Sequence, residues 1–174
     1  MDGSTCRNNG NGNSWIDAKL VGTQSNRSAI GAKVRVKATV GGKEFWQLRE
    51  ISGGGGYGSQ NDLRAHFGLG DVTNVEVIRI EWPSGIVQEF RELATKQLKT
   101  VVEPPRMLAR MANGMPQFTV RGGRGFQYQI DASTNLLVWQ PIGALTITNL
   151  NGKAEVTETN SPPSDRRFYR AVAH

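Results

Sequence analysis

The chain has 174 residues, a formal net charge of +6 and a hydrophobic content of 37%, which is low for a globular protein but above the range of disordered chains. It contains no apolar stretch of the roughly 18 residues that a transmembrane helix needs, and its first nine residues lack the apolar core of a signal peptide. Its single cysteine, Cys6, excludes an intramolecular disulfide and a multi-cysteine metal site.

Runs of β-branched and aromatic residues recur about every ten residues, with turn signals between them, which is typical of a sandwich or barrel. In the first part of the chain we expect strands at 15–21, 32–40, 43–51, 75–82, 86–90 and 98–102. The second of these alternates cleanly, with valines on one face and Lys33, Arg35 and Lys37 on the other, as a half-buried antiparallel strand requires. Gly41-Gly42 and Pro83-Ser84-Gly85 predict hairpin turns. Only the short stretch 92–97 is a candidate helix, and a simple turn is the alternative there.

Pro104-Pro105 marks a boundary, because neither residue donates a backbone N–H and the preceding residue is forced into an extended conformation. Beyond it we expect strands at 117–121, 126–131, 136–139, 145–148, 154–157 and 168–172. The predicted fold is therefore all-β, with two antiparallel β-sandwich or barrel-like domains in tandem. We expect residues 1–104 to form the first domain and residues 105–174 to form the second, smaller one.

A glycine-rich segment, Ser52–Gly70, separates the third and fourth expected strands and holds seven glycines. So much glycine indicates sharp turns, positive φ angles or close approach to another surface. The segment also carries Tyr57, Gln60, Asp62 and His66. It is either a structural crossover or a binding surface, and the rim around Tyr57 is where we expect a partner to bind.

Several motifs in the first half occur in the order typical of one family. They are Arg7-Asn8-Asn9-Gly10-Asn11-Gly12-Asn13, Leu20-Val21-Gly22-Thr23, Ser25-Asn26-Arg27, Ala29-Ile30-Gly31-Ala32, the glycine-rich segment through His66-Phe67-Gly68-Leu69-Gly70, and Trp82-Pro83-Ser84-Gly85. Through these motifs residues 7–103 resemble the ASPIC/UnbV domain. The second half resembles a small β domain at the end of large secreted bacterial proteins, through the stretch 128–136, Trp139 and the stretch 167–171. This resemblance implies a small fibronectin-like sandwich over residues 105–174.

The first resemblance implies a module that follows FG-GAP or VCBS repeats in extracellular proteins, and it transfers no established catalytic residue. The expected setting is the C-terminal end of a secreted or cell-surface bacterial protein, with an N-terminal repeat domain absent from this chain. That repeat domain is then an expected partner.

His66 is the best candidate for chemistry, since histidine acts as a general base, metal ligand or pH switch. Asp62 lies four residues before it and could orient its ring as half of a catalytic dyad. The alternative is a structural His66 whose ring is hydrogen-bonded to the backbone at a strand entrance. Ser52, Ser59 and Ser84 lie in expected turns, but none has the Gly-x-Ser-x-Gly pattern of a nucleophile elbow.

Cofactors are not expected, because two histidines and one cysteine supply too few ligands for a zinc site. A calcium site near Asn9–Asn13 is the weaker alternative, since the spacing fits a calcium loop but the carboxylates are missing. Residues 105–174 carry eight basic and four acidic residues. Their arginines are scattered and no nucleic-acid motif accompanies them, so we expect a solvated surface and no nucleic-acid partner.

These observations predict a non-catalytic binding or scaffolding module for a carbohydrate or protein ligand. Tyr57, Gln60, Trp46 and Arg27 are its candidate ligand-binding residues. The alternative is a small hydrolase that attacks ester or phosphoester bonds with His66 and Asp62. It requires His66 in an exposed pocket, whereas the binding module predicts His66 buried against the backbone. A third reading is a cap for the repeat domain, with no ligand of its own.

Overall fold

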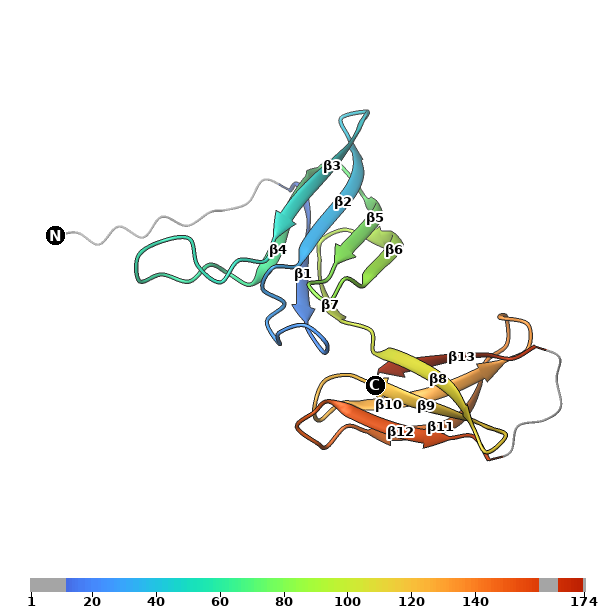
Figure 1. Ribbon diagram of the computed structural model, residues 1–174. Helices are drawn as coiled ribbons and strands as arrows, with labels where there is room; N and C mark the ends of the chain where they lie inside the picture. Colours follow the sequence, from blue (N-terminus) through green and yellow to red (C-terminus); the bar gives the residue numbers. More distant parts are fainter. Residues whose placement is uncertain (1–11, 160–165, 174) are drawn as a thin grey trace. The chain divides into compact units, whose positions relative to one another are not determined.

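The computed structural model describes residues 12–159 and 166–173 (Figure 1). All regular elements in these ranges are β-strands, so the all-β prediction is confirmed. The first seven are β1 Ser14–Val21, β2 Lys33–Val40, β3 Lys43–Glu50, β4 Arg64–Gly70, β5 Asn74–Glu81, β6 Val87–Ala94 and β7 Gln97–Val102. The remaining six are β8 Arg106–Ala112, β9 Met115–Arg121, β10 Gln127–Ser133, β11 Gln140–Thr146, β12 Lys153–Thr157 and β13 Phe168–Ala173. None of the described residues forms a helix long and apolar enough to cross a membrane.

The described chain divides into two compact units. Unit 1 comprises residues 12–19, 30–81 and 87–100. Unit 2 comprises residues 20–29, 82–86, 101–159 and 166–173. The loop 22–27 and the Pro83–Gly85 turn thus group with the C-terminal strands, although the chain reaches them before residue 104.

Unit 1 contains two sheets, with strand orders β4-β1-β7 and β3-β2-β5-β6. Strand β2 alternates as its sequence predicts, since Val34, Val36 and Ala38 are buried. Strand β4 follows the same period, with Ala65, Phe67 and Leu69 buried and the residues that alternate with them, His66 and Gly68, exposed. The period of two therefore places the apolar side chains of both strands in the core of this unit.

Unit 2 is a sandwich of two three-stranded sheets, β12-β9-β8 and β11-β10-β13. Its core contains Phe118 and Val120 from β9, Tyr128 and Ile130 from β10, and Ile147, all fully buried. The Phe118 ring lies 4.5 Å from that of Tyr169 on β13. Each sheet contributes one face to this core, as two packed sheets require.

Four expectations for local structure were wrong. Residues 92–97 form no helix: strand β6 continues to Ala94, which pairs with Asn74 of β5. The range 136–139 is a loop, and a strand lies instead at Gln140–Thr146. The end of the glycine-rich segment is strand β4, and Arg106–Ala112 forms the unexpected strand β8.

Candidate functional site

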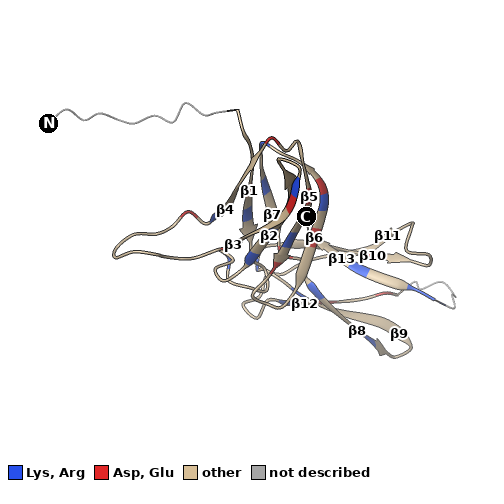
Figure 2. Ribbon diagram, turned by 90° about the horizontal axis from the view of Figure 1, so that it is seen from above, with Lys and Arg blue, Asp and Glu red and all other residues tan. Residues whose placement is uncertain are grey.

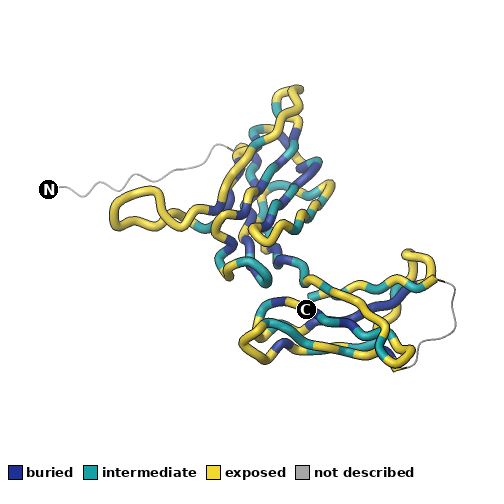
Figure 3. The backbone as a smooth tube through the Cα atoms, viewed as in Figure 1, coloured by how far each residue is buried: buried dark blue, intermediate teal, exposed yellow. Residues whose placement is uncertain are grey.

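The first part of the glycine-rich segment projects from unit 1 as a long loop between β3 and β4 (Figures 1 and 3). We call residues Ser52–Asp62 the arm. All eleven of its residues are exposed, and Tyr57 near its tip is 109% exposed. The tip is closed by an isolated bridge between Gly56 and Ser59, and Gly58 inside it has a φ of 69°. That positive φ favours glycine, which explains its place in so tight a turn.

The arm ends on an ion pair between Asp62 and Arg64 at the start of β4. Both carboxylate oxygens of Asp62 accept from the Arg64 guanidinium, and the Arg64 backbone N–H donates to Oδ1 at 2.9 Å. The side-chain hydrogen bonds from Arg64, followed by the backbone hydrogen bond, lower the pKa of Asp62 to about 2. Asp62 is therefore ionised at neutral pH, and its role is to anchor the arm to β4.

His66 lies on the exposed face of β4, opposite Asp17 of β1. Its Nδ1 is 2.7 Å from Asp17 Oδ1, and its ring stacks near that of Trp15, with ring centroids 6.4 Å apart. The His66 side chain is 65% exposed, so the expected burial against the backbone was wrong. The carboxylate that faces the ring is that of Asp17, while the Asp62 carboxylate binds Arg64. The structure thus pairs His66 with a residue 49 positions away.

The other candidate ligand-binding residues are dispersed. Gln60 is exposed on the arm. Trp46 is 49% exposed on β3, opposite Lys37 of β2. Arg27 lies in unit 2, where its guanidinium stands 4.8 Å from the centre of the Phe126 ring.

Most of the stretch proposed for calcium, Asn9–Asn13, lies outside the described residues, as does Cys6. Among the described residues no group of three potential metal-ligating side chains comes together.

Charged residues of both signs occur along the strands of the four-stranded sheet in unit 1 (Figure 2). Arg35 binds Glu81, and Arg79 lies between Glu81 and Glu89. Lys37 of β2 forms an ion pair with Glu44 of β3, with its Nζ 2.7 Å from Glu44 Oε2. Exposed ion pairs of this kind contribute little stability each. Because Arg35 and Lys37 of β2 are paired with acids, the positive charge of these two residues is compensated.

Glu103, which the sequence analysis did not single out, organises unit 2 from a fully buried position. Its Oε2 accepts the backbone N–H groups of Thr23 and Gln24, each at 2.8 Å, and that of Ser25 at 2.7 Å. Its Oε1 accepts the hydroxyls of Ser25 and Ser84. We call this cluster the Glu103 hub. It joins the loop 22–27, the Pro83–Gly85 turn and the end of β7, which are far apart in the sequence.

Burial of Glu103 by itself raises the pKa of its carboxyl group. Hydrogen bonds from Ser84, Ser25 and Thr23 to the charged form outweigh burial, and the pKa falls below its ordinary value. Ser84 therefore serves as a hydrogen-bond donor to a buried carboxylate, not as an activated nucleophile. Two signals in the sequence point to the hub: a carboxylate that directly follows an apolar strand, and a loop of small polar residues rich in donors.

Residues 22–107 match the model of the family described as ASPIC and UnbV. The match includes the arm, strand β4 and every residue of the Glu103 hub, and it confirms the resemblance drawn from the motifs. Searches of curated proteins and of solved structures found no match.

Proposed function

Because residues 22–107 form a domain of the ASPIC and UnbV family, we propose that this chain serves a larger protein as a non-catalytic recognition module. In this proposal the arm is the contact element, and Tyr57 is its anchor. The observation that carries the proposal is the complete exposure of Tyr57 on a loop of eleven exposed residues.

Packing within unit 1 does not account for the arm. Loops of this length without secondary structure are uncommon in compact domains and are usually functional. Its glycines raise the entropy cost of ordering it, and none of its side chains is buried. A tyrosine supplies a large amphipathic contact surface at low conformational cost, and tyrosine is enriched among the residues that dominate binding energy.

A protein partner fits the arm better than a carbohydrate. The arm projects outward, whereas ligand sites for small molecules are concave. The Trp15 ring on β1 of the same unit is already stacked near that of His66. A projecting aromatic tip suits insertion into a hollow on a partner protein. We further propose that the module acts in a secreted or cell-surface bacterial protein, whose repeat domain is a natural first partner to test.

Two observations favour the hydrolase alternative. The His66 side chain is exposed, as that alternative requires, and its 2.7 Å contact with Asp17 resembles the orienting pair of a general base. Turnover of p-nitrophenyl acetate or bis(p-nitrophenyl) phosphate tests it directly. The recognition module predicts no turnover above that of a His66→Ala variant, which should remain folded because the side chain is 65% exposed. Turnover that disappears in this variant would establish the hydrolase instead.

The recognition module is tested by placing a photo-crosslinking amino acid at position 57 of the full chain in its native host. A matched control carries the same group at position 98, since Leu98 is exposed on β7 of the same family domain. We expect a discrete protein adduct at position 57 only. Purified chain should compete for the adduct, whereas a Tyr57→Ala chain of equal stability should not.

Equal adducts at both positions, or equal competition by the two chains, would exclude the arm as the contact element. A glycan array probed with the wild-type and Tyr57→Ala chains tests the alternative that the ligand is a carbohydrate. Binding of a glycan by the wild-type chain, lost in Tyr57→Ala, would replace the protein partner with a sugar.

A further inference from the structure

Unit 2 exposes an apolar loop that its own core does not use. Between β10 and β11, Leu136 is 53% exposed, Leu137 is 85% exposed and Val138 is 62% exposed. Three neighbouring aliphatic residues facing solvent are unusual on a small domain, and exposed apolar patches often mark interaction sites. We call residues Thr134–Trp139 the apolar loop.

The apolar loop is held in one conformation by its own hydrogen bonds. The Ser133 hydroxyl accepts the backbone N–H of Leu136 at 2.9 Å. The Asn135 side-chain oxygen accepts the backbone N–H groups of Leu137 at 2.9 Å and Val138 at 3.0 Å. Leu136 has a φ of 64°, in the left-handed region that a leucine rarely adopts. Strained backbone of this kind clusters at functional sites, and a pre-formed loop loses little entropy on binding.

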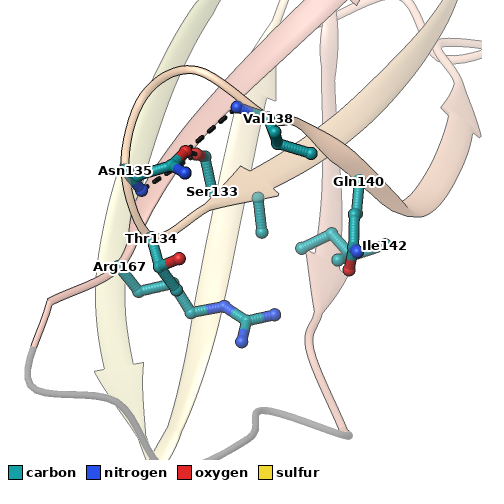
Figure 4. A pocket seen from close by; sticks show the side chains of 8 residues that line it. Ser133, Thr134, Asn135, Val138, Gln140, Ile142 and Arg167 are labelled. Atoms are coloured by element: carbon teal, nitrogen blue, oxygen red, sulfur yellow. Dashed lines mark hydrogen bonds between the residues drawn. The ribbon is translucent and has the colours of Figure 1, made fainter.

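A pocket of about 450 Å³ opens beside the apolar loop (Figure 4). Thr134, Asn135 and Val138 line it from the loop, and Gln140 and Ile142 line it from β11. Arg167, just before β13, completes the wall, and its guanidinium points into the space that these side chains surround. The pocket thus combines aliphatic walls with hydrogen-bonding groups, the usual composition of a ligand site.

The charges around the pocket are already compensated. Arg167 Nη2 binds the buried Glu158, whose other oxygen accepts the Tyr169 hydroxyl at 2.9 Å. Arg167 Nε has no partner among the described residues but is itself buried. The side chain as a whole is 15% exposed, so the guanidinium can still donate to a ligand although its charge is neutralised. The pocket therefore favours a neutral acceptor such as a carbonyl oxygen over an anion.

The aromatic side chain of the apolar loop, that of Trp139, already contacts a neighbouring arginine. The Arg170 guanidinium lies 4.4 Å from the centre of the Trp139 ring, and Arg170 is itself paired with the buried Asp131. None of the residues that line the pocket is aromatic, whereas sugar recognition commonly relies on an open aromatic face. A polypeptide offers both of the groups that the pocket does accommodate, an aliphatic side chain and a backbone carbonyl.

We propose that the apolar loop and this pocket bind an extended polypeptide segment of a partner protein. An aliphatic side chain of that segment packs on Leu137, Val138 and Ile142, and its backbone carbonyl accepts from Arg167 or Gln140. The site lies wholly in unit 2 and does not depend on the role proposed for the arm.

Titration of the isotopically labelled full chain with N-acetyl-Ala-Leu-Ala-amide, followed by NMR, tests this proposal. We expect shifts confined to residues 133–142 and to the Arg167 side chain, with a dissociation constant on the order of 1 mM for so small a probe. The matched peptide with serine in place of leucine should bind at least about fivefold more weakly, because the aliphatic contact is lost. Val138→Ser, at an apolar-loop residue that lines the pocket, should weaken binding of the leucine peptide similarly. Leu150→Ser, at an exposed apolar residue outside both the apolar loop and the pocket lining, should not.

Absence of shifts at these residues with the leucine peptide would overturn the proposal, as would equal affinity for the two peptides. Maltotriose or cellotriose that shifts the same residues more strongly would assign the pocket to a carbohydrate. Phospholipid vesicles that retain the wild-type chain, but not Leu137→Ser, would assign the apolar loop to a membrane surface. Either result would replace the polypeptide ligand.

Discussion

Replacement of Glu103 by glutamine or by leucine measures how much unit 2 depends on a single buried carboxylate. Glutamine preserves the shape of the side chain. Its amide oxygen can accept the three backbone N–H groups that now reach Oε2, and its NH2 group can donate to the hydroxyls of Ser25 and Ser84. Leucine fills a similar volume but accepts no hydrogen bond. The two variants therefore separate the negative charge from the hydrogen bonds.

The magnitudes follow from the five hydrogen bonds of the hub. In Glu103→Gln, the three backbone N–H donors keep an acceptor and lose only the charge assistance, and we expect a loss of about 2 kcal/mol in the free energy of unfolding. In Glu103→Leu, the same three N–H groups lose their acceptor in a buried site. At about 1–3 kcal/mol for each of the three unsatisfied groups, the expected loss is about 3–9 kcal/mol.

The pH dependence supplies an independent check on the charge. Because folding lowers the pKa of Glu103, the stabilisation is complete above the pKa of the unfolded chain and is lost as the pH falls through the folded value. Glu103→Gln has no titrating group at this position. Its stability deficit relative to wild type should therefore shrink as the pH falls from 7 toward 3.

Urea unfolding followed by tryptophan fluorescence and by circular dichroism, at pH 7 and at steps down to pH 3, measures these differences. A Glu103→Gln variant as stable as wild type at pH 7 would refute the argument that charge-assisted bonds hold the hub. A deficit unchanged between pH 7 and pH 3 would show that folding does not lower the pKa of Glu103. Equal losses in the glutamine and leucine variants would refute the assignment of the three N–H bonds.

Three further predictions concern the core, a loop and the base of the arm. Phe118→Ala should lower the stability of unit 2 by about 3–5 kcal/mol in the same unfolding assay, since its side chain is fully buried; a loss below about 1 kcal/mol would contradict this core. Gly22→Ala should destabilise strongly, because a Cβ there would lie 2.1 Å from a backbone oxygen, whereas Gly68→Ala meets nothing within 4 Å and should change stability little. Equal melting temperatures of these two alanine variants would contradict that geometry. Asp62 should titrate with a midpoint of about 2 by NMR, and Arg64→Gln should return it toward 3.8; an ordinary midpoint in the wild-type chain would show that the ion pair at the base of the arm does not form.

Sequence patterns predicted the strands best where alternation was strong and turn residues were explicit. Strand β2 begins one residue later than expected, and the Gly41-Gly42 hairpin connects it directly to β3. Both glycines have positive φ, at 56° and 76°, as a tight hairpin requires. In such segments, side-chain alternation and turn chemistry act within a few residues, so a local pattern is enough.

Prediction failed where local preference and pairing disagreed. The stretch 92–97 is rich in helix-forming residues, but β6 pairs with β5 up to Ala94, and Glu92 and Lys96 both have positive φ. Sheet pairing overrides helix propensity there. The apolar stretch 136–139 has strand-like composition, yet Ser133 and Asn135 bind its backbone N–H groups and hold it as a loop.

Composition, period and motif order were thus sufficient for the all-β class, for most strands and for the family of residues 22–107. They could not pair His66 with Asp17 or bring Ser25 and Ser84 to Glu103, because those partners are 49, 78 and 19 residues apart. Strand register and chain crossings decide which polar groups meet, and burial decides whether a carboxylate must then be satisfied. Spacing along the chain carries none of this information, which is why the Glu103 hub and the pocket beside Arg167 emerged only from the folded arrangement.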